Sequence, residues 1–240
     1  MPTNSVLTRA HALWEGLAGA PVSFSSTEPV DVAISPRAMI CPQGWAGFIV
    51  LQGRAIVTVP SASAAAAVRS AVAELSVEDF ADPGMLGRVL CLEEVLGPAT
   101  LAYLDEHDFL QAPTGSVSVD RLSAEHPDVR QLEVLAGEHD SEESGLREIT
   151  SPAFVVRIHD KVVAAAGYRM WPSRTAHMSV LTAPGNRGQG LARLTGSVAV
   201  AHALEAGLLP QWRARTPQSQ RVALALGFRE LGAQLSARLS

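Results

Sequence analysis

The stretch that most constrains the fold is residues 179–206, where an apolar segment, a glycine-containing turn and a long helix are expected in that order. The apolar segment stops at Pro184-Gly185, and an alanine-rich helix is predicted to start near Gly188. The first backbone N–H groups of a helix have no intrahelical partner, and the helix dipole adds roughly half a positive charge there. A strand, a turn and a helix N-terminus in this order predict an anion site.

Three residues of the turn favour phosphate as the anion. Gly188 and Gly190 have no Cβ, so the backbone can approach an oxyanion closely. Arg187 adds a forked cation that suits phosphate geometry.

Two segments of the chain resemble signatures of the GNAT N-acetyltransferase superfamily. The residues Arg187-Gly188-Gln189-Gly190-Leu191-Ala192 are similar to its acetyl-CoA signature, in which Gln or Arg precedes two free positions, Gly, a free position, and Gly or Ala. The segment from Ser219 to Gly227-Phe228 is similar to the second signature, a helix that closes on Gly-Phe. The resemblance covers roughly the last half of the chain and implies an α/β fold with a mixed sheet.

Residues 113–240 are expected to form the GNAT-like acetyl-CoA-binding domain, following a linker at 111–115. The expected elements are a strand at 116–121, a helix at 124–139, a loop at 141–145, strands at 152–159 and 162–170 joined by Asp160-Lys161, a strand at 176–183, the long helix, a strand at 209–214, a helix at 217–226 and closing strands at 228–239.

Residues 1–112 are expected to form a small α/β module whose role the sequence does not indicate. Its predicted elements are a helix at 1–20, strands at 47–51 and 55–59 joined at Gln52-Gly53-Arg54, and a helix that Ser61 caps. No grouping of catalytic residue types is apparent in this part of the sequence.

The resemblance implies a set of contacts to acetyl-CoA as co-substrate. In the family, the strand before the phosphate turn carries a bulge whose open backbone groups bind the pantetheine and the thioester carbonyl. By motif position, the implied cofactor-binding residues are Val180, Leu181, Thr182, Arg187, Gly188, Gln189, Gly190, Leu191, Ala192, Arg193, Thr216 and Ser219.

The sequence departs from the family at the positions of its common acid and base. Ala223 stands where many members have a proton-donating tyrosine, and Gln211 stands where some have a glutamate base. His177 is the catalytic candidate that remains, because an unperturbed pKa of about 6.5 suits a base near neutrality. The alternative is a strand histidine that is hydrogen-bonded into the sheet.

The charge is unevenly distributed along a chain whose net charge is −5. From Arg187 to the end, seven arginines and two glutamates give +5, as a site for the phosphates of CoA requires. Residues 123–148 hold eight acids and two arginines, which gives −6. Because this segment flanks the acceptor site in GNAT proteins, a cationic amine acceptor is one hypothesis, and a solvated acidic helix face is the other.

Composition excludes several classes of protein. No apolar run of about 18 residues is present, so no membrane span is expected, and the negative charge argues against a nucleic-acid partner. Cys41 and Cys91 show no metal-ligand spacing, and no metal is expected. They are expected to be buried, reduced thiols of a cytoplasmic protein, and a single disulfide between them is the alternative.

The leading hypothesis is an N-acetyltransferase that acts on an amine of a small molecule or peptide, with a homodimer left open. A CoA-binding sensor or assembly module without catalysis is the alternative, which the missing tyrosine and glutamate favour. A nucleotide-binding oxidoreductase is rejected because the glycines at 185, 188 and 190 do not match the dinucleotide-binding spacing.

Overall fold

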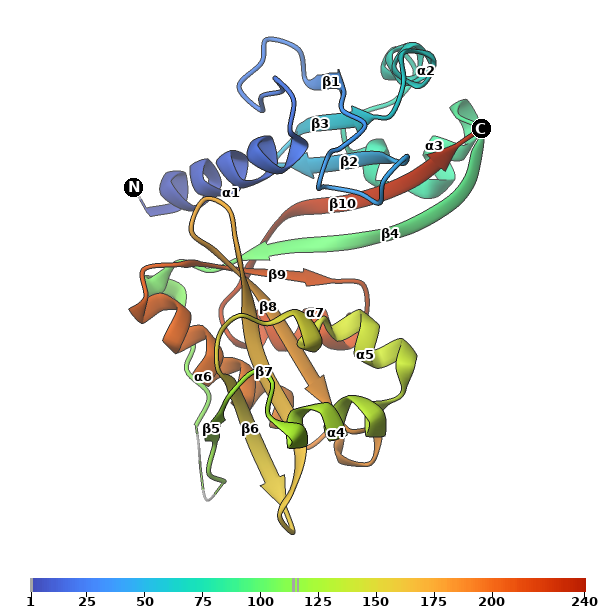
Figure 1. The fold of residues 1–240 in the computed structure, drawn as a ribbon. Helices are drawn as coiled ribbons and strands as arrows, with labels where there is room; N and C mark the ends of the chain where they lie inside the picture. Colours follow the sequence, from blue (N-terminus) through green and yellow to red (C-terminus); the bar gives the residue numbers. More distant parts are fainter. Residues whose placement is uncertain (1, 114, 116) are drawn as a thin grey trace. The chain divides into compact units, whose positions relative to one another are not determined.

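A computed structural model describes residues 2–113, 115 and 117–240 of the chain (Figure 1). The chain forms two compact units, one made of Met1–Ala102 with Glu230–Ser240 and the other of Tyr103–Arg229. Both units combine helices with β-strands, which confirms the predicted α/β class.

The division of the chain differs from the boundary predicted at residue 112. Residues 103–112 belong to the second unit, in which the N–H groups of Leu104 and Leu110 donate to the carbonyls of Pro210 and Leu226. Residues 230–240 belong to the first unit, because the last strand pairs with a strand near residue 50. That pairing joins segments far apart in the sequence, so no local pattern could indicate it.

The first unit has the strand order β1-β3-β2-β10-β4. Its elements are α1 (Pro2–Ala18), β1 (Val30–Ile34), β2 (Ala46–Leu51), β3 (Arg54–Val59), α2 (Ala62–Val72), α3 (Pro83–Val89), β4 (Leu92–Tyr103) and β10 (Arg229–Leu239).

Local features of the first unit follow the sequence closely. The β2–β3 hairpin turns at Gln52 and Gly53, whose φ angles of 48° and 73° suit a two-residue hairpin turn. The Ser61 side chain accepts a hydrogen bond from Ala64 N and caps α2, as predicted. Both cysteines are free, but Cys91 is exposed and not buried as expected.

The second unit has the strand order β9-β8-β7-β6-β5. Its elements are β5 (Asp120–Leu122), α4 (Pro127–Ala136), α5 (Glu138–Ser144), β6 (Ala153–Ile158), β7 (Lys161–Trp171), β8 (Thr175–Thr182), α6 (Leu191–Glu205), β9 (Leu209–Ala214) and α7 (Pro217–Ala225).

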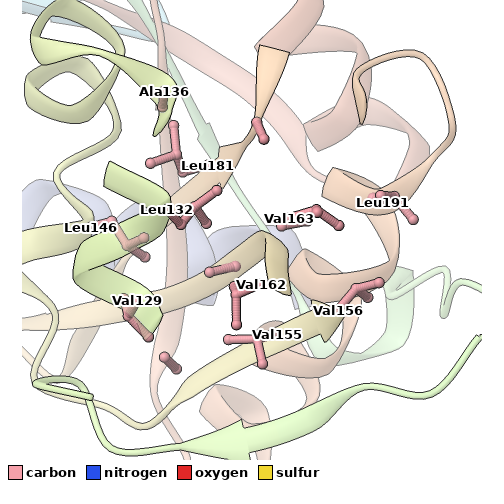
Figure 2. Close-up of a cluster of buried hydrophobic side chains, with 14 of the residues drawn as sticks. Val129, Leu132, Ala136, Leu146, Val155, Val156, Val162, Val163, Leu181 and Leu191 are labelled. Atoms are coloured by element: carbon pink, nitrogen blue, oxygen red, sulfur yellow. The ribbon is translucent and has the colours of Figure 1, made fainter. Parts of the chain in front are cut away.

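The helices of the second unit cover both faces of its sheet (Figure 1). Val129 and Leu132 of α4 pack with Val155, Val163 and Leu181, whose side chains alternate with those that face α6. Figure 2 shows this core, in which Leu132 and Leu181 lie close together.

Three predicted elements of the second unit differ in their bounds. The helix predicted at 124–139 is broken at Gly137, whose φ is 88°, and the α5 that follows extends through residues 141–144, where a loop was expected. The β6–β7 turn is formed by His159 and Asp160, one residue earlier than predicted. The first strand covers Asp120–Leu122, and position 116 of the predicted strand lies outside the described residues.

The core of the second unit yields a matched test of stability. Leu132 is fully buried, whereas Leu135 on the same helix is 51% exposed. We expect Leu132→Ala to destabilise the second unit by about 2–5 kcal/mol through lost burial and a cavity. We expect Leu135→Ala to cost less than about 0.5 kcal/mol. Urea unfolding followed by circular dichroism measures both, and equal losses would contradict the assignment of the buried face.

Candidate active site

The candidate anion site lies where β8, the following turn and α6 meet. Gly188 and Gly190 have φ angles of 78° and 75°, so the turn uses the left-handed conformation that glycine permits. A Cβ built on either glycine has no heavy atom within 4 Å, which means that the space beside the turn is open. Gly190 is the N-cap of α6 and provides no side-chain cap. The first N–H groups of the helix, from Leu191 to Arg193, therefore remain available to an anion.

Two buried polar atoms beside this turn have no hydrogen-bond partner within the described chain: Thr182 Oγ1 and Arg193 Nε. Buried polar groups are normally paired, so unpaired ones next to an open helix N-terminus are consistent with a polar ligand. The residues predicted from the first signature thus come together in space, on the end of β8, the turn and the first turn of α6.

Next to the anion site, strands β8 and β9 part from each other. Their parallel register comprises three described pairs, from Thr175–Leu209 to His177–Gln211. β8 continues for five more residues, through Val180 to Thr182, and keeps an unbroken antiparallel register with β7. The bulge that the resemblance implied is therefore not seen in the β7–β8 register. The side of β8 that faces β9 opens because the two strands separate.

Thr216 and Ser219 lie at the start of α7. The Thr216 side chain caps the helix by accepting from Ser219 N at 3.3 Å. Ser219 Oγ in turn accepts a hydrogen bond of 2.9 Å from Nε1 of Trp212, a buried residue of β9. A Cβ built on Gly196 of α6 would lie 3.6 Å from the Trp212 ring. This tryptophan therefore holds α7 against β9 and leaves little space beside α6.

Arg187 is already engaged by protein groups. Its Nη2 forms an ion pair with Asp140 of α5, and its Nε donates to the Thr182 carbonyl at 3.3 Å. The guanidinium remains about half exposed at the mouth of the turn. An anion that binds at the turn would therefore compete with the Asp140 carboxylate for the Arg187 guanidinium.

His177 lies at the last β8–β9 pair before the strands part. Its Nδ1 is 2.5 Å from Oε1 of the buried Gln211, so Nδ1 carries the proton and the lone pair of the neutral ring is on Nε2. The imidazole stacks on Trp171 with 4.0 Å between the ring centroids. Burial and, next, the positive charge of Arg213 lower the pKa of His177 to about 3, although its hydrogen bond to Gln211 acts in the opposite direction.

The lowered pKa changes what His177 can do. A group with a pKa of about 3 is neutral throughout the physiological range and is a weak base. The sequence-based expectation of a base with a pKa of about 6.5 therefore does not fit the structure. The hydrogen bond to Gln211 agrees with the alternative of a histidine fixed within the sheet.

The acidic segment at 123–148 is largely neutralised by arginines. Five of its eight acids form ion pairs: Asp128 with Arg157, Glu133 with Arg130 and Arg147, Asp140 with Arg187, Glu143 with Arg215, and Glu148 with Arg169. Counting sequence charges gave −6 because four of these arginines, Arg157, Arg169, Arg187 and Arg215, lie outside the segment. The electrostatic argument for a cationic acceptor is thus much weakened.

Sequence reasoning missed the arginines that surround His177. Arg169 is the register partner of His177 on β7, and Arg213 lies two residues beyond Gln211 on β9. The Arg213 guanidinium carbon is 5.9 Å from the Trp171 ring centroid. The alternation of Arg213 and Arg215 after Gln211 was the available signal, but the pairing of β7, β8 and β9 was needed to place these residues together.

Tyr168 is engaged on the face of the sheet that α6 covers and does not replace a proton donor at Ala223. Ala223 is buried on α7, and Tyr168 OH pairs with His202 Nδ1 of α6 at 3.0 Å. No cluster of three or more potential metal ligands occurs among the described residues. Across the same residues, no helix is both long and apolar enough to cross a bilayer.

Comparison with known proteins identifies the class of this domain. The model of a family described as GNAT acetyltransferase matches residues 151–233, which include β8, the turn, α6, β9 and α7. This match confirms the resemblance predicted from the two signatures for residues 151–233. No curated protein matches the chain.

Solved structures of GNAT proteins resemble the chain at low sequence identity. A GCN5-related N-acetyltransferase from Kribbella flavida is 20% identical with a TM-score of 0.50, and the match covers 65% of this chain and 63% of that one. A putative acetyltransferase from Novosphingobium aromaticivorans is 24% identical with a TM-score of 0.45, covering 61% and 65%. A putative acetyltransferase from Salmonella typhimurium, solved with its cofactor acetyl-CoA, is 16% identical with a TM-score of 0.39, covering 51% and 92%. The chain thus spans less than two thirds of the first two structures, and the likeness concerns the fold.

The pKa of His177 predicts how stability depends on pH. Between pH 6.5 and 3 the unfolded chain binds a proton at this residue and the folded chain does not, so the stabilisation that neutral His177 gives above pH 6.5 is lost as the pH falls. We expect His177→Gln to lose less stability than the wild type between pH 7 and pH 5. Urea unfolding at both values measures the difference, and an NMR titration of the ring with a midpoint near 6.5 would contradict the buried, neutral assignment.

Proposed function

We propose that the second unit transfers an acetyl group from acetyl-CoA to an amine. The observation that carries the proposal is the junction of β8 and α6, where an uncapped helix N-terminus with open space at two glycines adjoins a strand that has parted from its neighbour. The match of this region to the GNAT acetyltransferase family supports the same reaction.

The residues fit the chemical parts of acetyl-CoA in order. The N–H groups from Gly188 to Arg193 would hold the pyrophosphate, with Arg187 and Gln189 at the mouth. The open side of β8 at Val180, Leu181 and Thr182 would bind the pantetheine, and Thr216 and Ser219 would border it from α7. Because a strand rises about 3.3 Å per residue, His177 lies about 16 Å along β8 from Thr182. The acyl end would therefore lie near the point where the strands part.

Acetyl-CoA would supply the acyl group as a thioester that is open to attack by a neutral amine. The amine nitrogen forms a bond to the carbonyl carbon, the C–S bond breaks, and the proton lost by nitrogen balances the proton gained by the thiolate. We propose that Nε2 of His177 accepts a hydrogen bond from the amine and orients it, because a group with a pKa of about 3 does not hold the proton well.

A CoA-binding module without catalysis is the second candidate. The buried Ala223 at the position of the family's tyrosine favours it, as does the low pKa of His177. Turnover separates the two candidates. Release of free thiol from acetyl-CoA that depends on an added amine supports the transferase, and binding of acetyl-CoA without release for any amine supports the module.

Binding of CoA tests the proposed site directly. Gly190→Asp places a carboxylate beside the first N–H groups of α6, and Asp tolerates the left-handed backbone better than most residues do. We expect the affinity for CoA in calorimetry to fall at least about 100-fold, since hydrogen bonds to charged groups contribute about 1.5–3 kcal/mol each and repulsion adds to their loss.

Gly185→Asp is the matched control. It adds the same charge to the same turn, at a glycine outside the left-handed region that has open space around it. We expect this variant to retain most of the affinity, with thermal unfolding used to check that both proteins fold. Near wild-type affinity in folded Gly190→Asp would refute the assignment of the pyrophosphate site.

A further inference from the structure

A group of arginines and aromatic rings gathers where β8 and β9 part. We define the arginine cluster as Arg169, Arg213 and Arg215 together with Trp171, His177 and Gln211. The stacking of His177 on Trp171 and the hydrogen bond from His177 to Gln211 join residues of β7, β8 and β9. Arg213 follows Gln211 by two residues on β9, so both side chains lie on the same face of the sheet.

This face of the sheet is the one that α4 and α5 cover. Ser179 lies two residues after His177, and its hydroxyl donates to the carbonyl of Gly145 at the end of α5. Glu143 of α5 pairs with Arg215, and Glu148 pairs with Arg169. α6 packs on the opposite face, where His202 contacts Phe154 and Tyr168. The cluster is therefore separated by the sheet from α6.

The arginine cluster brings three guanidinium groups together. Arg169 and Arg215 pair with Glu148 and Glu143. Arg213 is partly buried, and burial followed by the charge of Arg215 lowers its pKa, with the two glutamates acting in the opposite direction. The same guanidinium lowers the pKa of His177, so the potential at His177 is positive.

Gln211 adds a second indication of a polar ligand. The residue is fully buried, and its Nε2 has no hydrogen-bond partner among the described residues, although its Oε1 is paired with His177. Nε of Arg215 is also buried and unpaired. Buried donors without partners are costly, and an anion brings the acceptor atoms that they lack.

We propose that the acceptor is an amine that also carries an anionic group, a carboxylate or a phosphate, which the arginine cluster binds beside the acetyl-transfer site. The inference rests on the proposed function and names its substrate class. Guanidinium forks bind either anion through paired N–H···O bonds. A polycationic acceptor would meet repulsion from the guanidinium groups that lower the pKa of His177.

Paired acceptors test the proposal with the full-length protein and acetyl-CoA, with free thiol as the readout. L-phenylalanine is compared with L-phenylalaninamide, phosphoethanolamine with ethanolamine, and spermidine serves as the polycation. We expect the anionic member of at least one pair to have a kcat/KM at least about 10-fold above its neutral partner. The pair that responds distinguishes a carboxylate from a phosphate.

Variants of the arginine cluster add a second test, because removing an arginine and removing a glutamate should change the preference for the anionic acceptor in opposite directions. Arg213→Gln is expected to lower kcat/KM about 10- to 100-fold more for the anionic acceptor than for its neutral partner, chiefly through KM, and to leave the Kd of acetyl-CoA unchanged. Glu148→Gln removes a carboxylate that is 63% exposed and should increase the preference for the anionic acceptor, which a folding defect would not do. Arg215→Gln replaces Arg213→Gln if the latter fails to fold. Arg121→Gln, an exposed arginine of the edge strand β5, is the control and should change nothing.

Several outcomes would overturn the inference. Higher kcat/KM for spermidine or for both neutral amines would do so, as would equal effects of the Arg213 variant on both members of a pair. If acetyl-CoA binds but no amine is acetylated, the affinity of each paired amine for the acetyl-CoA-loaded protein is measured by calorimetry. Equal affinities of the anionic and neutral members in both pairs would reject the proposal. Absence of acetyl-CoA binding would instead overturn the proposed function itself.

Discussion

The separation of β8 from β9 after the pair His177–Gln211 is the constraint on which the site depends. A strand inside a sheet uses its backbone groups on both sides, so a ligand can bind along it only where one neighbour departs. β7 holds β8 in register over its whole length, and Trp212 anchors β9 to α7 through Ser219. The opening is thus maintained by packing on both sides and needs no bulge in β8.

Two ion pairs connect the acidic segment at 123–148 with the opening between β8 and β9, one at the anion site and one at the arginine cluster. Asp140 of α5 pairs with Arg187 beside the anion site, and Glu143 of the same helix pairs with Arg215 in the arginine cluster. The local charge at each end is therefore the balance between an arginine and a carboxylate that come from distant parts of the chain.

The sequence predicted the elements whose causes are local. The turn at Gly188 and Gly190, the cap at Ser61 and the β2–β3 hairpin depend on a few adjacent residues, and they appear where expected. Residues 141–144 of α5 were read as a loop because their acidic sequence shows no apolar stripe. The partner of β10 and the environment of His177 depend on strands far apart in the chain, so composition and spacing could not indicate them. The pKa of His177 was misjudged for this reason: its neighbours Gln211 and Arg213 lie more than thirty positions away.

The depressed pKa of His177 has a consequence for any ammonium group that lies beside it. Burial and a positive potential disfavour every cation at that place, whether the proton is carried by an imidazole or by an alkylamine. An amine seated next to Nε2 would therefore release its proton to solvent more readily than the same amine in water. Under the proposed function, this arrangement would supply the neutral nucleophile through electrostatics, so a site with Gln211 and Ala223 in place of an acid and a base would not require a strong base. The proton would then be lost on binding, and it would be measurable as proton release when the acceptor is titrated in buffers of different ionisation enthalpy.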